Sequence, residues 1–293
     1  MATVSCAPEP RGERVQIDGR TMHVVRAGPK AGELTVLLEA GSFVFSADWA
    51  VVQQQLAAKG IASIAYDRAG LAHSGPGPSP RDGLAIVSDL EMLLAALGES
   101  APFVVAGHSM AGLHIHLFAA RNPEKVAGLV FVDAITPALA ADPAAKRVAA
   151  TYVQFSRAAA WAASRGLLKP LSRWADQIGL TPEAAGRKRW AFADPAHNRA
   201  AADEVIQWET SVSQATAAGP LNPGWPVAVV LAGPVRAPPR QEAVRTEPAR
   251  RSPHGHHERV LGANHASLIG ARHAEAVTRA IVHVRDAAMA AAA

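Results

Sequence analysis

Ser109 lies in a segment whose residue types could make it a nucleophile. Residues 107–112 read GHSMAG and follow a short apolar run at 103–106 that is typical of a buried strand. A serine on a sharp turn between a strand and a helix presents its hydroxyl, and small neighbours let the two elements approach closely. The usual pattern ends in glycine, whereas this chain has Ala111 followed by Gly112. We therefore predict a nucleophile at Ser109; the simpler alternative is that it only caps the helix.

Attack on a carbonyl also needs hydrogen-bond donors for the oxyanion that forms. The N–H of Met110 is the natural first donor, because backbone N–H groups are free at the start of a helix. A second donor is expected in the loop after the apolar run at 35–38, where Gly41 lets the backbone approach a substrate. The N–H of Ser42 is our candidate; the alternative is that these residues only form an ordinary turn.

Serine needs a base to take its proton, and the chain has 12 histidines to choose from. His265 follows a short predicted strand at 259–261 and a Gly-Ala-Asn turn, which places it on a loop at the end of a strand. That edge of an open α/β sheet is where ligands bind, so His265 is the predicted base. The other histidines have simpler explanations: packing beside the turn or on the next helix for His108, His114 and His116, and a solvated loop, rather than a metal site, for His254, His256 and His257.

A carboxylate should hold the histidine in the correct tautomer. The loop at 232–240, after a predicted strand at 227–231, contains no carboxylate, and the first one beyond it is Glu242 on a predicted helix. Asp133 instead ends the strand at 126–132, which should lie beside the strand that leads to Ser109. We prefer Asp133 and keep Glu242 as the alternative acid; Asp133 could also simply cap the segment that follows.

Strand and helix patterns alternate through the first half of the chain, which indicates a parallel α/β sheet. The runs are apolar on both faces, as expected of strands covered by helices on each side. Strands are predicted at 35–38, 61–66, 103–106, 126–132, 227–231 and 259–261, and helices at 48–59, 84–97, up to 120, 241–250 and 274–285.

No strand pattern is convincing between residues 138 and 218. This segment is rich in alanine and arginine and holds four of the six tryptophans, Trp161, Trp174, Trp190 and Trp208. We interpret it as a helical insertion. The predicted domains are therefore a core of residues 1–136 and 221–293 and a helical cap of residues 137–220.

The composition indicates a compact globular protein: 49% of its 293 residues are hydrophobic and 18% are charged. The net charge of +4 is spread along the chain without a basic helix or nucleic-acid motif, so no nucleic-acid partner is expected. A single cysteine, Cys6, excludes an intrachain disulfide. We see no signal peptide and no membrane-length apolar run, and expect a cytoplasmic protein without a membrane partner. The sequence leaves the oligomeric state open.

Together these segments resemble the α/β-hydrolase superfamily. The resemblance rests on residues 38–42 with 48–49, residues 66–70 with 73–74, residues 107–112 and the histidine loop at 262–265. It covers about 15–134 and 226–284, with the insertion resembling the family's cap. It implies a mostly parallel eight-stranded sheet with helices on both faces, the order Ser–acid–His and no metal or organic cofactor. Some members place the acid after the sixth strand, which matches Asp133.

The resemblance implies a serine hydrolase of the carboxylesterase type, with a small hydrophobic acyl substrate held under the cap. Haloalkane dehalogenases and epoxide hydrolases resemble this pattern but carry aspartate where this chain has Ser109. The same residues would also serve C–C bond hydrolysis, lactone opening, acyl transfer or a lyase reaction, because fold and triad do not separate these. A third hypothesis is a non-catalytic ligand-binding protein on the same fold.

Overall fold

The computed structural model describes residues 11–29, 34–100, 102–235 and 238–292, and Cys6 lies outside them. Eight strands form one sheet in the order β1-β2-β4-β3-β5-β6-β7-β8. Strands β3 to β8 pair in parallel, whereas β2 pairs antiparallel with both β1 and β4. The predicted fold class is thus confirmed. The strands are β1 (Glu13–Ile17), β2 (Arg20–Ala27), β3 (Thr35–Glu39), β4 (Ser63–Asp67), β5 (Phe103–His108), β6 (Val126–Val132), β7 (Val227–Ala232) and β8 (His256–Val260).

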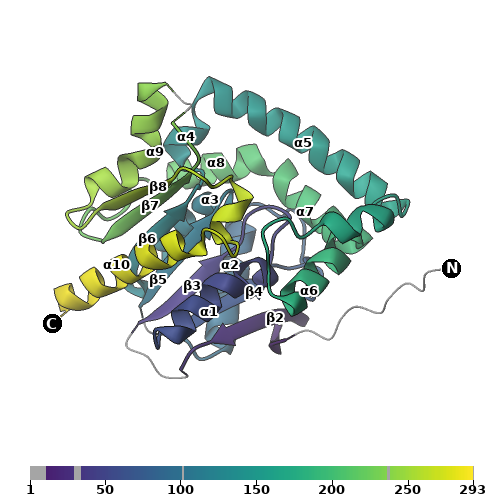
Figure 1. Ribbon diagram of the computed structural model, residues 1–293, viewed down its shortest axis with the longest axis horizontal. Helices are drawn as coiled ribbons and strands as arrows, with labels where there is room; N and C mark the ends of the chain where they lie inside the picture. The colour runs from purple at the N-terminus through teal and green to yellow at the C-terminus, as the bar shows by residue number, and fades with distance from the viewer. Residues whose placement is uncertain (1–10, 30–33, 101, 236–237, 293) are drawn as a thin grey trace.

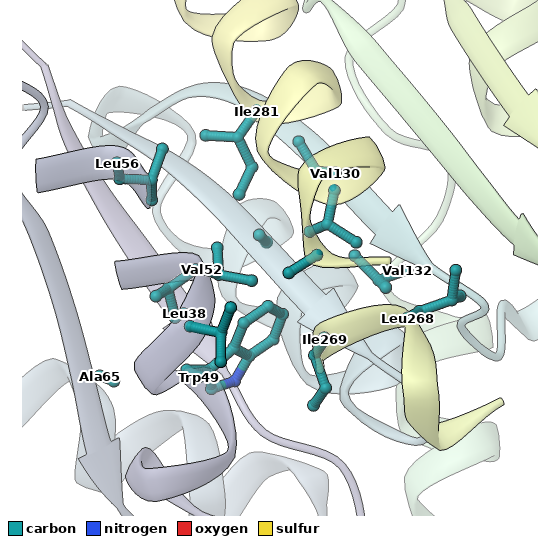
Figure 2. Packing of buried hydrophobic residues seen from close by; sticks show 14 of the residues in the cluster. Leu38, Trp49, Val52, Leu56, Ala65, Val130, Val132, Leu268, Ile269 and Ile281 are labelled. Atoms are coloured by element: carbon teal, nitrogen blue, oxygen red, sulfur yellow. The ribbon is translucent and has the colours of Figure 1, made fainter. Parts of the chain in front are cut away.

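Helices cover both faces of the sheet, and the central strands are buried between them (Figure 1). Helices α1 (Ala50–Ala58) and α10 (Ala274–Ala292) pack on one face, and α2 (Gly83–Ala96), α3 (Ala111–Arg121) and α9 (Pro239–Arg251) pack on the other. Because side chains alternate along a strand, β3 sends Val36 and Leu38 into one core and Leu37 into the other. Figure 2 shows the first core, where Leu38, Trp49 and Val52 pack close to Ile269.

The ends of the predicted helices follow local signals. Asp82 caps α2, since its carboxylate accepts a hydrogen bond from the N–H of Ala85 at 3.0 Å. Gly60 and Gly98 follow α1 and α2 with φ of 71° and 69°, as expected of C-terminal glycines. The helix predicted from residue 48 begins instead as a 3₁₀ helix, η1 (Ser46–Trp49), and becomes α-helical only at Ala50.

Only helices lie between β6 and β7, within residues 137–220, all of which the structure describes. They are α4 (Pro137–Ala140), α5 (Pro143–Ser164), η3 (Lys169–Trp174), α6 (Pro182–Ala193), α7 (Pro195–Ile206) and α8 (Trp208–Ala217). We call α4–α8 with η3 the cap helices. In Figure 1, α5, α6 and α7 lie beyond the edge of the sheet, and α8 lies nearer to it. Contacts join α8 to α3 and α5 to α7.

At its two ends the sheet differs from the prediction, by one strand pair that was missed and one strand that was wrongly bounded. The hairpin β1–β2 was not predicted, because charged residues and a histidine interrupt its apolar pattern. The final strand, β8, starts at His256 rather than at residue 259, so His256 and His257 belong to a strand instead of a solvated loop. His254 precedes this strand and is exposed. None of the helices in the described ranges is long and apolar enough to cross a membrane.

Candidate active site

The register of the central strands brings the ends of β3, β5 and β6 to one level of the sheet. His108 at the end of β5 is the register partner of Val132 at the end of β6, so Ser109 and Asp133 follow side by side. Glu39 at the end of β3 pairs with Gly107, which places Gly41 against Ser109. Three segments far apart in the sequence thus meet at the carboxyl edge, where open α/β sheets bind ligands.

Ser109 occupies a sharp turn with a φ of 59°, a left-handed conformation that non-glycine residues rarely adopt. Its N–H donates to the carbonyl of Val132 at 3.2 Å, and its carbonyl accepts from the N–H of Ile135 at 2.9 Å. These two bonds to the β6 end fix the strained turn. The side chain of Ser109 is part-exposed, whereas those of both neighbours, His108 and Met110, are buried.

The glycines beside this turn are required by close approach. A Cβ on Gly107 would lie 3.0 Å from the carbonyl oxygen of Ala111, and one on Gly112 would lie only 2.2 Å from the carbonyl oxygen of Ile135. Position 111 tolerates a methyl group, and Ala111 is completely buried. The strict need for glycine therefore falls one residue later than in the usual pattern.

The structure brings Asp133 to His265. The Nδ1 of His265 lies 2.7 Å from Oδ2 of Asp133, while Oδ1 of Asp133 accepts a hydrogen bond from Arg245 on α9. Burial alone would raise the pKa of Asp133, but the hydrogen bond from His265 and the charges of His265 and Arg245 outweigh it, so the pKa is lowered. Asp133 is therefore an ionised acceptor that holds the proton of His265 on Nδ1 and leaves Nε2 free to accept one.

The loop that carries His265 is fastened to the turn at Ser109. Nε2 of His108 donates to the backbone carbonyl of His265 at 3.0 Å, and the two imidazole rings lie 4.6 Å apart between centroids. Burial lowers the pKa of His108 to about 3, so this ring is neutral. The side chain of His265 is 51% exposed, and within the described chain it forms no direct hydrogen bond with the hydroxyl of Ser109. Catalytic hydrogen bonds often tighten only when substrate binds.

Glu242, the alternative acid, lies elsewhere. It sits on α9 as predicted, but its carboxylate pairs with Arg259 of β8. Arg245, one turn further along α9, is the residue that reaches the site. Sequence reasoning missed Arg245, because which of several arginines on a helix faces a carboxylate depends on how that helix packs.

The loop after β3 lies against the turn at Ser109. A Cβ on Gly41 would lie 2.9 Å from the Cβ of Ser109, so only glycine allows this approach. The hydroxyl of Ser42 lies 3.4 Å from the sulfur of Met110. Both candidate oxyanion donors, Ser42 and Met110, thus belong to segments that flank Ser109.

An apolar cavity of about 590 Å³ begins at Phe43, next to Ser42, and extends under the cap helices. Among the described residues that line it, the one Lys or Arg is Lys188, which is paired with the buried Asp48 at 2.7 Å. The cavity therefore offers mainly hydrocarbon surface to a ligand. It is lined by residues of the 43–45 loop, α5, η3, α6 and α7, among them Phe45, Tyr152, Phe155, Ala159, Ala162, Leu171 and Phe192.

A buried charged cluster lies behind this loop, and sequence reasoning assigned it no role. Arg68 follows β4 and pairs with Glu39 of β3 and with Glu204 of α7. The side chains of all three are at most 2% exposed. Among the described residues, no group of three or more His, Cys, Asp or Glu side chains is arranged to hold a metal ion.

The sequence matches the family model described as alpha/beta hydrolase fold over residues 36–172. A protein of Hormonema carpetanum named "Probable transporter efuK" is 34% identical over 120 residues, 38% of this chain and 16% of that protein. "Uncharacterized protein YqjL" of Bacillus subtilis is 30% identical over 117 residues, 40% of this chain and 46% of that protein. The matched segment thus spans less than half of either relative.

Solved structures resemble nearly the whole chain. The enol-lactonase from Burkholderia xenovorans is 17% identical with a TM-score of 0.66, covering 94% of this chain and all of its own. An epoxide hydrolase variant from Vigna radiata is 14% identical with a TM-score of 0.72, covering 95% and 99%. A thermophilic esterase from Thermogutta terrifontis is 21% identical with a TM-score of 0.65, also covering 95% and 99%. With the strand order and the family model, this likeness shows that the chain has the α/β-hydrolase fold.

Proposed function

We propose that this protein is a serine hydrolase that cleaves a small hydrophobic ester or related acyl substrate through an acyl-enzyme. One observation carries the proposal: a buried carboxylate, Asp133, holds Nδ1 of His265 at 2.7 Å beside a serine on a left-handed turn. An acid, an imidazole and a serine in this relation are the parts that acyl transfer needs. Ser109 also argues against epoxide hydrolysis, for which the resembling enzymes use aspartate at this position.

In the proposed first half-reaction, Oγ of Ser109 attacks the substrate carbonyl carbon while Nε2 of His265 takes the hydroxyl proton. The carbonyl π electrons move to oxygen, and the N–H groups of Ser42 and Met110 hold the oxyanion. The tetrahedral intermediate then collapses, and His265 gives its proton to the departing alkoxide. An alcohol leaves, and the acyl group stays on Ser109.

Water completes the cycle in the second half-reaction. His265 takes a proton from water as its oxygen attacks the acyl carbon, and the same two N–H groups hold the second oxyanion. Collapse breaks the bond to Ser109, which recovers its proton from His265. Asp133 stays ionised throughout and stabilises the imidazolium that forms twice.

The substrate class follows from the cavity. Its walls are mostly alkyl and aromatic side chains, and Lys188 is already neutralised by Asp48. A cavity of about 590 Å³ accommodates a small or medium acyl or alkyl group rather than a polymer. We therefore expect p-nitrophenyl esters of hydrophobic acids to be turned over.

Turnover of these esters by the Ser109→Ala variant tests the proposal. We expect its kcat/KM to fall at least about 10³-fold, because both half-reactions pass through Oγ. Ser213→Ala is the matched control, since Ser213 is an exposed serine on α8, and it should keep full activity. Full turnover by Ser109→Ala would remove this serine from the mechanism.

A fluorophosphonate probe tests the same assignment without a chosen substrate. An activated serine loses its proton to the base and displaces fluoride, so intact-mass spectrometry should show one adduct at Ser109. Labelling should vanish in Ser109→Ala and persist in Ser213→Ala. An unlabelled but folded wild-type protein would favour a ligand-binding role instead.

A further inference from the structure

We propose that Arg68 is a positioning residue for the oxyanion donor of Ser42, and that helix α7 of the cap fixes it there through Glu204. The inference rests on the proposed function, because it concerns the same oxyanion. It assigns a catalytic consequence to a cap-to-core ion pair that lies behind the site rather than in it.

Arg68 holds two successive carbonyl groups of the loop after β3. Its Nη1 donates to the carbonyl of Ala40 and to Oε1 of Glu39 at 2.9 Å, and its Nη2 donates to the carbonyl of Gly41 at 2.8 Å. The side chain is 2% exposed, so water does not compete for these carbonyls. The guanidinium therefore sets the direction of the peptide groups that it binds.

The direction of one peptide group decides where the Ser42 donor points. In a trans peptide the C=O and the N–H lie on opposite sides, so the Gly41 carbonyl and the Ser42 N–H point in opposite directions. Because Arg68 holds that carbonyl, the Ser42 N–H is directed away from the cluster. Gly41 also lies against Ser109, where a Cβ would be 2.9 Å from the serine Cβ. This orientation turns the N–H toward the space beside the nucleophile.

Glu204 from α7 completes the binding of the guanidinium. Its two carboxylate oxygens accept from Nε and Nη2 of Arg68 at 2.9 and 2.7 Å, a bidentate pair that fixes the plane of the fork. Burial alone would lower the pKa of Arg68, but the carboxylates of Glu204 and Glu39 raise it above its usual value. The guanidinium of Arg68 is thus charged, immobile and oriented by Glu204 of α7, which lies 136 residues further along the chain.

A second side chain of α7 binds the same loop. The ring of His197 lies edge-on to that of Phe45, with 5.7 Å between the centroids, and its Nδ1 accepts from the N–H of Ala72 at 3.1 Å. Helix α7 therefore contacts the loop on both sides of Ser42, at Gly41 through Arg68 and at Phe45 through His197.

Two substitutions test the inference by a split between kcat and KM. Arg68→Lys keeps the charge but loses the fork, and Glu204→Gln replaces one acceptor oxygen by an NH₂ group that faces an N–H of Arg68. An oxyanion donor acts mainly in the transition state, so we expect kcat for p-nitrophenyl esters to fall about 10- to 100-fold in Arg68→Lys, with KM little changed. Glu204→Gln should show a smaller loss in the same direction.

The rate of fluorophosphonate labelling and the amide NMR signal of Ser42 give independent readouts. In the wild-type adduct the Ser42 N–H should shift downfield as it binds the phosphoryl oxygen, and this shift should shrink in both variants while labelling slows. Val284→Ala, a buried truncation in α10 next to Gly128 of β6, controls for lost stability. It should lower the melting temperature without changing kcat below that temperature.

The outcomes separate this inference from the proposed function. Failure of the wild-type protein to label at Ser109 would overturn the proposed function. Normal wild-type labelling together with unchanged kcat, labelling rate and Ser42 shift in Arg68→Lys would overturn the inference alone. If Arg68→Lys does not fold, the same comparison in Glu204→Gln decides the matter, because that variant keeps Arg68 paired with Glu39.

Discussion

His265 and Asp133 are hydrogen-bonded at 2.7 Å although 132 residues separate them in the sequence and strand β7 lies between their strands. The pair forms because the 261–265 loop returns across the end of β7 and is fastened by His108 to the turn at Ser109. The side chain of Asp133 is 8% exposed, so its charge is little screened by solvent. The imidazole is thus oriented by a buried anion at the level of Ser109.

The two candidate acids can be separated by mutation. Asp133→Asn should lower kcat by roughly 10³-fold or more, because an amide cannot stabilise the imidazolium and permits the wrong tautomer. Glu242→Gln should leave kcat near the wild-type value, since Glu242 pairs with Arg259. Steady-state kinetics on one p-nitrophenyl ester checks both, and a larger loss in Glu242→Gln than in Asp133→Asn would reverse our assignment.

The close approach at Gly112 predicts a difference between two neighbouring substitutions. Gly112→Ala places a methyl carbon 2.2 Å from the Ile135 carbonyl, so the backbone must move and unfolding free energy should fall by at least about 2 kcal/mol. Ala111→Gly creates no clash and should cost about 1 kcal/mol through helix propensity. Urea denaturation of both variants measures the difference; equal losses would mean that the backbone adapts freely at position 112.

Stability should fall as the pH drops below neutral. Burial, aided by nearby positive charge, lowers the pKa of His108 to about 3 and that of His197 to about 4, from 6.5. The unfolded chain therefore binds these protons near pH 6.5 while the folded chain does not, so protonation favours unfolding. Melting temperatures should decrease steadily between about pH 6.5 and 4.5. His108→Gln should flatten this slope, and an unchanged slope would place the titrating groups elsewhere.

A larger side chain in the cavity should change which acyl-chain length the protein prefers. Ala159 lines it from α5, so Ala159→Phe should shift the preferred p-nitrophenyl ester toward shorter acyl chains. Gln154, exposed on the same helix and outside this lining, supplies the control Gln154→Phe, which should leave the profile unchanged. kcat/KM across acetate to decanoate measures both. An unaltered profile in Ala159→Phe would place the acyl group in another part of the molecule.

The central strands and the helices beside them were predictable because each carries its own pattern. Strands such as β5 and β6 are apolar on both faces, and glycines 60 and 98 mark where helices end. The hairpin β1–β2 was not predictable, because charged residues and a histidine interrupt its apolar pattern.

In the candidate site, too, some residues were predictable from local pattern and others were not. Ser109 and His265 follow from local motifs, and Asp133 from the expected neighbourhood of two strands. The contacts of Arg245, His197 and Glu204 were out of reach, because each depends on which face of a helix packs against a loop more than 90 residues away in the chain. The spacing of residues along the sequence does not indicate which side chains make such long-range contacts.

Helix α7 is fastened to the core through Glu204 and Arg68. The insertion therefore has two parts whose sequences can change to different degrees. A shift of α7 would move the loop after β3 that carries Ser42, whereas most of the cavity wall comes from α5, η3 and α6, which can accept new side chains without moving that loop. Relatives with a different substrate preference could therefore arise, or be engineered, by exchanging α5, η3 and α6 while α7 stays unchanged.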